Sequence, residues 1–288
     1  MDSFIDLINN FEDKKLCFVD PSGGNHGDYL IKLGLFKKLD ELNVSYDIDI
    51  RDSRSFLSLR YFRKYKLPVI RYFWKHKKVD YSNYDLVILR GGGYLNDIWY
   101  GVLFLLELLK NSRNVVVAPQ SCWFRSMMLG EQLKGIKIPL TIFTREKYSY
   151  EYLRGANLPK KVKVELAPDS ALYLNTSDLI EFTNPYPQKP LFCFRKDLES
   201  KISPTELETL IKKYPEAQIE DIAINGTFNN FMSRIWSASI IYTDRLHVAI
   251  AGLILGKKVV LYSNSYWKNK GVYEYNLKKY DNIKFIDI

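Results

Sequence analysis

Residues 239–247 read SIIYTDRLH, and the apolar run VAIAGLIL follows at residues 248–255. A short apolar run, a polar turn and a longer apolar run predict a buried strand that leads into a helix. Arg245 and His247 then stand at the C-terminal end of the strand, where open α/β sheets bind their ligands. A guanidinium binds carboxylate or phosphate, and an imidazole transfers protons near neutral pH. The segment therefore predicts an α/β fold with a site for chemistry on a small phosphorylated acid.

Outward from this segment, short apolar runs alternate with helical patterns, which is typical of βαβ units and parallel sheets. In the first part of the chain, strands are predicted at residues 16–19, 46–50, 86–89, 115–117, 140–143 and 162–166, and helices at 28–42, 95–110 and 146–153. The last part repeats the alternation, with strands predicted at 191–194, 218–222, 239–242 and 258–261, and helices at 204–213, 228–236 and 245–255. The expected fold class is therefore α/β.

A cluster of prolines marks the expected domain boundary. Residues 184–190 read NPYPQKP and hold three prolines. Prolines at this density favour an extended connection over a helix or a central strand. We therefore expect a linker at 184–190 between an N-terminal Rossmann-like domain, residues 1–183, and a C-terminal one, residues 191–288. Two such domains that face each other across a cleft are the simplest architecture.

The bulk composition limits the class of protein. The chain has 288 residues, of which 47% are hydrophobic, enough for a substantial core and unlike a disordered chain. The three cysteines, Cys17, Cys122 and Cys193, favour a reducing compartment, and neither a disulfide framework nor a zinc site. The start of the chain is acidic where a signal peptide is basic, and no uncharged apolar run approaches the roughly 18 residues of a membrane span. We expect a cytoplasmic protein.

The net charge of +9 is concentrated in residues 51–80, where ten basic residues outnumber two acidic ones and aromatic residues such as Trp74 are interleaved. Three interpretations are open. The segment is a solvated helical insertion whose aromatic residues pack inward, a contact with an anionic membrane surface, or a nucleic-acid surface. The sequence contains no motif of a nucleic-acid-binding module, so no nucleic-acid partner is expected.

Glycine-rich and amide-bearing turns follow several predicted strands. GGNHGD at residues 23–28 lets the backbone approach an anion at the start of the next helix, although a tight turn explains it equally. Asp28 is either a helix cap or a base for a sugar hydroxyl. In RGGGYL at 90–95, three glycines leave the end of a predicted strand without side chains. Such a loop either lies against a bound substrate or is a flexible turn. APQS at 118–121 offers an amide and a hydroxyl to a hydroxyl-rich ligand, or is a plain loop.

Arginines stand at the ends of two further predicted strands. Arg145 follows residues 140–143, and Arg195 follows residues 191–194. A lone arginine at a strand end is usually part of a surface ion pair, and a lone histidine is often a packed or capping residue. Polar or glycine-rich clusters, however, end nearly every predicted strand, and parallel strands end at one edge of their sheet. This convergence favours a ligand site at that edge.

Read in order, these motifs resemble those of the polysaccharide pyruvyl transferase family. The similarity spans roughly residues 16–275. It consists of Gly-Asn-x-Gly-Asp at 24–28, three glycines at 91–93, Pro-Gln-Ser at 119–121, Arg-Glu-x-x-Ser at 145–149, Pro-Asp at 168–169, Arg-x-Asp at 195–197, Asp-Arg-Leu-His at 244–247, and Lys270. One departure is Cys122-Trp123-Phe124, where family members often have a small residue and Gly-Pro. This difference points to a different acceptor pocket.

The resemblance implies a fold of the GT-B kind, transfer of pyruvate from phosphoenolpyruvate to a sugar as a cyclic ketal, and no essential metal or cofactor. The donor carries a carboxylate and a phosphate, so it needs two cationic clamps, for which Arg195 and Arg245 are the candidates. His247 is the candidate general acid that protonates the enol carbon. Arg145 or Lys270 is expected to stabilise charge at the leaving phosphate.

The acceptor side has its own candidates. Asp28 is the candidate base for the sugar hydroxyl. The remaining residues expected to bind or orient substrate are Asn25, Gly91, Gly92, Gly93, Gln120 and Ser121. The acceptor is expected to be a sugar of a bacterial surface-polysaccharide precursor, carried on a lipid at the inner membrane face, where the basic segment 51–80 would hold the enzyme peripherally.

Two other functions are compatible with this fold. A nucleotide-sugar glycosyltransferase needs a base pocket and an acidic residue near the ribose in the second domain, and the sequence shows neither clearly. A catalytically silent scaffold in a polysaccharide-synthesis complex is disfavoured, because the arginine and histidine positions are all present.

The membrane interpretation of residues 51–80 is directly testable. Trp74→Ala combined with two or three Lys→Glu changes among the neighbouring lysines is expected to reduce binding to anionic liposomes, because it removes an interfacial aromatic anchor and reverses charge. Co-sedimentation with vesicles measures the binding. Unchanged binding, or no binding by the native protein, would contradict a membrane contact.

Overall fold

The computed structural model describes residues 2–11, 13–22, 24–52, 80–96, 101–184 and 187–288. The basic segment predicted at 51–80 lies almost wholly outside these residues. Its proposed membrane contact therefore stays a prediction.

The described chain forms two compact units. Unit 1 comprises residues 1–24, 39–144 and 149–167, and unit 2 comprises residues 25–38, 145–148 and 168–288. The expected linker at 184–190 lies inside unit 2. The chain therefore passes between the units at several points, whereas the proline pattern predicts a single crossing.

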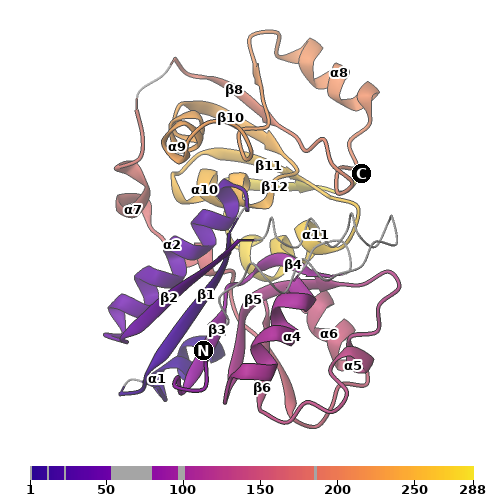
Figure 1. Ribbon diagram of the computed structural model, residues 1–288. Helices are drawn as coiled ribbons and strands as arrows, with labels where there is room; N and C mark the ends of the chain where they lie inside the picture. The colour runs from indigo at the N-terminus through magenta and orange to yellow at the C-terminus, as the bar shows by residue number, and fades with distance from the viewer. Residues whose placement is uncertain (1, 12, 23, 53–79, 97–100, 185–186) are drawn as a thin grey trace. The chain divides into compact units, whose positions relative to one another are not determined.

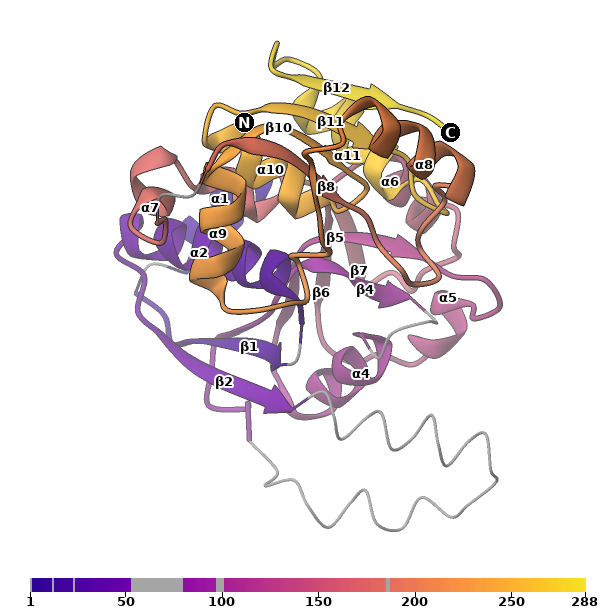
Figure 2. The ribbon, with the colours of Figure 1, turned by 90° about the horizontal axis from the view of Figure 1, so that it is seen from above.

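Unit 1 is built on a parallel sheet. Its strands are β1 (Leu16–Ser22), β2 (Tyr46–Asp52), β3 (Leu86–Leu89), β4 (Gly92–Asn96), β5 (Val115–Trp123), β6 (Leu140–Thr144) and β7 (Val162–Leu166). Its helices are α1 (Ser3–Asn9), α4 (Gly101–Asn111), α5 (Leu129–Gln132) and most of α6 (Lys147–Arg154). The strand order is β2-β1-β3-β5-β6-β7, and β4 pairs with β5. Figure 2 shows β1 and β2 side by side at one edge.

The core of unit 1 explains why these segments are strands. Val87 and Leu89 of β3 pack with Val115 and Val117 of β5, and helix α4 covers them through Leu105. Alternate positions of a strand point to the same face, so each strand presents a row of branched apolar side chains to the helix. The expected α/β fold with parallel sheets is confirmed.

The triple glycine differs from its prediction. Residues 92–96 form strand β4, so the helix expected from residue 95 is wrong at its start. A Cβ on Gly91 would lie 2.3 Å from the carbonyl oxygen of Pro119, and Gly92 has a φ of 139°, which residues with a side chain rarely adopt. The glycines therefore let β4 pair with the extended end of β5.

Unit 2 is built on a second parallel sheet. Its strands are β8 (Lys189–Cys193), β9 (Gln218–Ile219), β10 (Ala238–Thr243), β11 (Lys258–Tyr262) and β12 (Ile283–Ile286), in the order β12-β11-β10-β8-β9. Its helical segments are α2 (His26–Glu41, through Lys38), η2 (Ser170–Tyr173), α7 (Thr176–Ile180), α8 (Pro204–Lys213), α9 (Phe228–Trp236), α10 (Leu246–Ile254), α11 (Lys268–Val272) and η3 (Tyr273–Leu277).

Both faces of this second sheet are covered. Leu191 and Ile241 pack in a core with α9 and α10, whereas Phe192 and Tyr242 pack in another core with residues of α8. Figure 1 shows α9 and α10 together on one side of the strands and α8 on the other. Parallel strands buried on both faces are typical of doubly wound folds.

Helix α2 follows β1 of unit 1, but its first turns pack within unit 2. Leu30 lies in the unit 2 core. Gly27 and Gly34 are about two turns apart and lie on one face of the helix. A Cβ on Gly34 would lie 1.9 Å from the carbonyl oxygen of Ser170, and a Cβ on Gly27 would lie 2.7 Å from the Cβ of His247. Only glycine allows α2 to approach both neighbours so closely.

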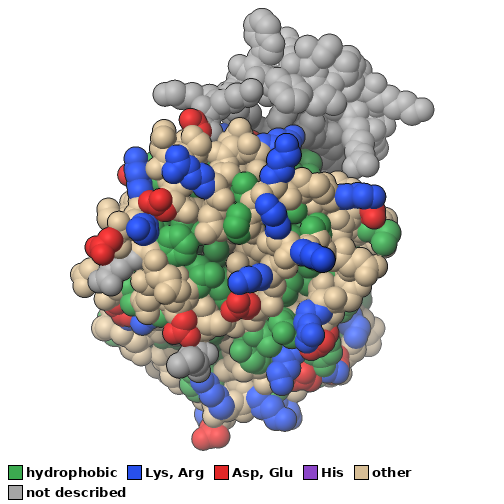
Figure 3. All heavy atoms as spheres, turned by 90° about the horizontal axis from the view of Figure 1, so that it is seen from below, with side chains coloured by type: hydrophobic (Ala, Val, Ile, Leu, Met, Phe, Trp, Pro, Cys, Tyr) green, Lys and Arg blue, Asp and Glu red, His purple; other side chains and the backbone are tan. Residues whose placement is uncertain are grey.

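The surface adds two observations. On the face seen in Figure 3, Lys and Arg side chains are interspersed with Asp and Glu among the described residues. In the part of the chain that the structure describes, no helix is both long and apolar enough to cross a bilayer.

Replacing Gly34 with alanine is expected to destabilise the protein, because the added methyl group would collide with backbone atoms of Ser170. Overpacking of this kind costs about 1–3 kcal/mol of the free energy of unfolding. Urea unfolding followed by circular dichroism measures it. Gly155→Ala is the matched control, since the nearest atom to its added Cβ would lie 3.6 Å away. Equal stability of the two variants would contradict the close packing of α2 on η2.

Candidate functional site

The strand order of unit 2 places the candidate site. The chain runs from β8 outward to β9 and then returns to the other side of β8 to form β10. Ligands of doubly wound sheets bind at the carboxyl ends of the strands that flank such a reversal. Arg195 follows the end of β8, and Arg245 follows the end of β10. The sequence therefore correctly places both arginines at one sheet edge.

Arg245 is held by a buried carboxylate. Its Nε donates to Oδ1 of Asp221 at 3.0 Å, and its Nη2 donates to Oδ2 of the same residue. The side chain of Asp221 is 3% exposed, so this fork-to-fork pair is shielded from water. The remaining nitrogen, Nη1, lies 3.6 Å from Oδ2 of Asp197.

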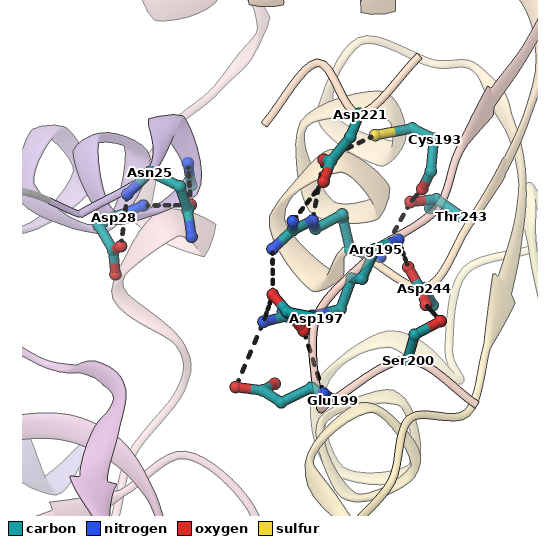
Figure 4. Close-up of polar contacts among 12 residues, drawn as sticks. Asn25, Asp28, Cys193, Arg195, Asp197, Glu199, Ser200, Asp221, Thr243 and Asp244 are labelled. Carbon is teal, nitrogen blue, oxygen red and sulfur yellow. Dashed lines mark hydrogen bonds and ion pairs between the residues drawn. The ribbon is translucent and has the colours of Figure 1, made fainter. Parts of the chain in front are cut away.

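Arg195 is paired with the same Asp197. Nε and Nη2 of Arg195 donate to the two oxygens of Asp197, each at 2.8 Å, and Nη2 lies 3.3 Å from Oε1 of Glu199. Figure 4 shows the carboxylate of Asp197 beside Arg195, and Oδ2 of Asp197 also lies 3.6 Å from Nη1 of Arg245. Burial opposes ionisation of Asp197, but the hydrogen bond and charge of Arg195 lower its pKa overall. Asp197 therefore occupies the position where an anionic ligand would contact both arginines.

Asp244 fastens the two strand ends together. Its Oδ1 accepts the backbone N–H of Arg195 at 2.8 Å, and its Oδ2 accepts the hydroxyl of Ser200 at 3.2 Å. Burial raises the pKa of Asp244 to about 6, although the amide and charge of Arg195 and the charge of Arg245 oppose the rise. The motif that contains His247 therefore also holds the loop that carries Arg195.

Lys268 is a buried lysine of this cluster that was not among the predicted site residues. Its Nζ donates to Oε2 of Glu199, and its side chain is 7% exposed. Burial lowers the pKa of Lys268 to about 8, and the neighbouring charge of Glu199 limits the fall.

The expected cation Lys270 lies elsewhere. Its Nζ pairs with Asp287 at 2.8 Å, and the two side chains are 41% and 50% exposed. Positions two apart on a helix point in nearly opposite directions, and Lys268 and Lys270 are both in α11. A local motif therefore identifies the helix but not which lysine faces inward.

His247 belongs to a second polar group at the start of α10. Its Nε2 lies 3.2 Å from Oδ2 of Asp169 and 3.3 Å from Nη1 of Arg145, and Nη1 of Arg145 donates to Oδ2 of Asp169 at 2.7 Å. Arg145 and Asp169 are fully buried, and the side chain of His247 is 13% exposed. Burial would raise the pKa of Asp169, but the charges of His247 and Arg145 lower it well below its usual range. Asp169 thus links Arg145 and His247, two residues predicted to be catalytic. The sequence placed Asp169 only in the Pro-Asp motif at 168–169.

The start of α2 lies against this group. Asn25 caps the helix: its Oδ1 accepts the N–H of Gly27 at 2.8 Å, and Oδ2 of Asp28 accepts the N–H of Asn25 at 2.9 Å. Of the two interpretations of Asp28, the helix cap is the one that these contacts match. Figure 4 shows both capping side chains at the start of α2. Gly27 packs on His247, as described above.

The other predicted binding residues lie in unit 1. Gly91, Gly92 and Gly93 form the approach to β4 and its start, and Gln120 and Ser121 are in β5. Gln120 is fully buried, and neither its amide nitrogen nor its amide oxygen has a hydrogen-bond partner among the described residues. An amide in this state is costly unless something else satisfies it.

The model of the polysaccharide pyruvyl transferase family matches residues 25–266. No curated protein matches the chain in sequence. Among solved structures, a functionally uncharacterized protein from Klebsiella pneumoniae is 22% identical, with a TM-score of 0.71 and coverage of 99% of this chain and 97% of that chain. The two share a fold.

Two further solved structures are less similar to the chain. The heptosyltransferase WaaC of E. coli, with ADP-2-deoxy-2-fluoro heptose, is 9% identical with a TM-score of 0.41, covering 94% of this chain and 92% of that chain. A UDP-N-acetylglucosamine 2-epimerase is 10% identical with a TM-score of 0.47, covering 90% of this chain and 81% of that chain.

The two lysines of α11 allow a matched test. Lys268→Met is expected to lower the free energy of unfolding by about 3 kcal/mol, because Glu199 then loses one partner of a buried ion pair. Lys270→Met is the control and is expected to change little, since its pair with Asp287 is exposed. Urea unfolding of both variants gives the comparison. A loss of stability confined to Lys270→Met would contradict these positions.

Proposed function

Because the chain belongs to the polysaccharide pyruvyl transferase family, we propose that it transfers pyruvate from phosphoenolpyruvate to a sugar of a bacterial surface-polysaccharide precursor, with a cyclic ketal as product. The observation that supports the proposal is that two arginines and a histidine lie at one edge of the second sheet. Arg195 and Arg245 share a carboxylate there, and His247 lies in the first turn of helix α10, which follows Arg245.

The arginines supply the donor site of the proposal. Phosphoenolpyruvate is an anion with a carboxylate and a phosphate, and each suits a guanidinium fork. Both forks contact Asp197, whose side chain is 38% exposed, whereas Asp221 is nearly fully buried. The donor would therefore displace Asp197 and leave Asp221 in place. Arg245 would stay anchored from behind while its outer nitrogen binds the ligand.

His247 would act as the general acid. As an imidazolium it would give a proton to the methylene carbon of the donor, which leaves positive character on the neighbouring carbon. A sugar hydroxyl oxygen would bond to that carbon, the bond to the phosphate oxygen would break, and a second hydroxyl would close the ketal. Two hydroxyl protons are released: one restores the imidazolium, and the other leaves through a base or the phosphate. General acid catalysis of this kind contributes about 10²–10⁴-fold in rate.

Fixed cations would stabilise the leaving phosphate. Arg145 stays a candidate, since its guanidinium is anchored beside His247 by Asp169. Lys268 replaces Lys270 in the proposal, because Lys268 pairs with Glu199, which also contacts Arg195, whereas Lys270 pairs with Asp287 at the surface.

The acceptor assignments are further proposals. Asp28 is the candidate base, and its contact with Asn25 holds its carboxylate at the start of α2. Gln120 and Ser121 of unit 1 are candidates for binding sugar hydroxyls, and the amide of Gln120, which has no hydrogen-bond partner among the described residues, supports this role. A lipid-linked acceptor is proposed from the composition of residues 51–80.

The test is phosphate release from phosphoenolpyruvate in the presence of a galactose-type acceptor, with EDTA added because no metal is expected to be required. His247→Ala is expected to reduce the turnover number by about 10²–10⁴-fold while thermal unfolding stays native-like. Turnover only with a nucleotide sugar would support a glycosyltransferase instead. If no donor supports any turnover, the protein is a scaffold. A near-normal rate of the His247→Ala variant would show that His247 is not the general acid.

A further inference from the structure

The imidazole of His247 is held through one nitrogen. Nε2 lies 3.2 Å from Oδ2 of Asp169, and Nη1 of Arg145 donates to the same oxygen at 2.7 Å. The other oxygen of Asp169 accepts the N–H of Ala171 at 2.9 Å. Both oxygens of Asp169 are therefore engaged from different sides, and the carboxylate cannot turn without breaking a buried contact.

These contacts decide where the ring proton sits. An arginine only donates hydrogen bonds, and an ionised carboxylate only accepts them. A lone pair on Nε2 would face the negative oxygen of Asp169, which is unfavourable in a buried site. A proton on Nε2 instead bonds to that oxygen, and the contact with Arg145 at 3.3 Å then joins two donors that share one acceptor. The charge of Asp169 therefore favours a neutral ring that carries its proton on Nε2.

The second ring nitrogen, Nδ1, has a different environment. It makes no hydrogen bond with the residues that the structure describes, and it lies beside the start of α2. A Cβ on Gly27 would lie 2.9 Å from Nδ1. A side chain at Gly27 would therefore collide with this nitrogen and with the Cβ of His247, so glycine is needed for Nδ1 to stay unblocked.

We infer that Asp169 is a positioning residue that fixes the Nε2–H form of His247, so that Nδ1, which makes no hydrogen bond with the described residues, is the atom that exchanges protons with the substrate. This inference rests on the proposed function for the identity of the substrate. The imidazolium loses the Nδ1 proton to the methylene carbon of the enol, and its Nε2–H stays bonded to Asp169. A proton released from a sugar hydroxyl then returns to Nδ1.

The assignment also explains the pairing of Arg145 with Asp169. Sharing the oxygen with Arg145 leaves the pair of Arg145 and Asp169 neutral, so the imidazolium carries the single net charge of the group. Outer carboxylates of this kind orient a histidine and set its tautomer.

The direct test is nitrogen NMR of the full chain labelled with ¹⁵N-histidine. The chain has three histidines, so the spectrum of His247→Gln identifies the signals of His247. At a pH high enough for the ring to be neutral, long-range proton–nitrogen correlations are expected to show the proton on Nε2. A neutral His247 with its proton on Nδ1 would overturn the inference, and this measurement needs no substrate and no variant of Asp169.

Asp169→Asn provides the kinetic arm. The amide oxygen can still accept the N–H of Ala171, but the carboxylate charge that selects the tautomer is lost. The turnover number is expected to fall about 10²–10⁴-fold with the KM for phosphoenolpyruvate within about threefold, as when a histidine loses the carboxylate that orients it. The NMR tautomer should change in the same variant. An unchanged tautomer together with native turnover would overturn the role of Asp169.

Asp178→Asn is the matched control, since Asp178 is another capping aspartate of unit 2 that pairs with Lys37 at 2.6 Å. It is expected to keep both the tautomer and the turnover. Failure of the native protein to turn over phosphoenolpyruvate would contradict the proposed function only. A wrong tautomer in an active enzyme would contradict only the present inference.

Discussion

The buried carboxylate of Asp169 holds together parts of the chain that are far apart in sequence. Arg145 comes from the connection after β6, and His247 comes from the start of α10, and both contact one oxygen of Asp169. Removing one partner from a buried pair of this kind costs about 3–5 kcal/mol, because the other charge stays buried and uncompensated. The helix α2 can lie over this group only because Gly27 and Gly34 lack side chains. The position of the imidazole is therefore set before any ligand arrives.

The cluster around Arg195 and Arg245 follows a similar rule of compensation. The charges of both arginines are compensated in the structure, because Arg195 pairs with Asp197 and Arg245 pairs with Asp221. Under the proposed function, the donor anion would take the place of one carboxylate, and Asp197, whose side chain is 38% exposed, would be the one displaced. Arg245 itself would need little reorganisation, because Asp221 would still hold it from behind.

The sequence predicts the features that are local. The run at 239–255 leads to β10 and α10 at nearly the expected residues, because the apolar pattern and the turn lie within one segment. The strand β4 was not predicted, since its pairing with the end of β5 depends on how closely Gly91 approaches a distant backbone. The partnership of Asp169 with His247 was not predicted either, because it spans 78 residues. A pattern places residues at a sheet edge, but only packing decides which pairs meet.

The most direct measurement is a crystal structure of the protein with phosphoenolpyruvate bound and no acceptor present. The donor's carboxylate and phosphate are expected on Arg195 and Arg245 in place of Asp197, with its methylene carbon next to Nδ1 of His247 and Nε2 still on Asp169. A donor bound away from these arginines, or a methylene carbon that faces a residue other than His247, would contradict the central claim.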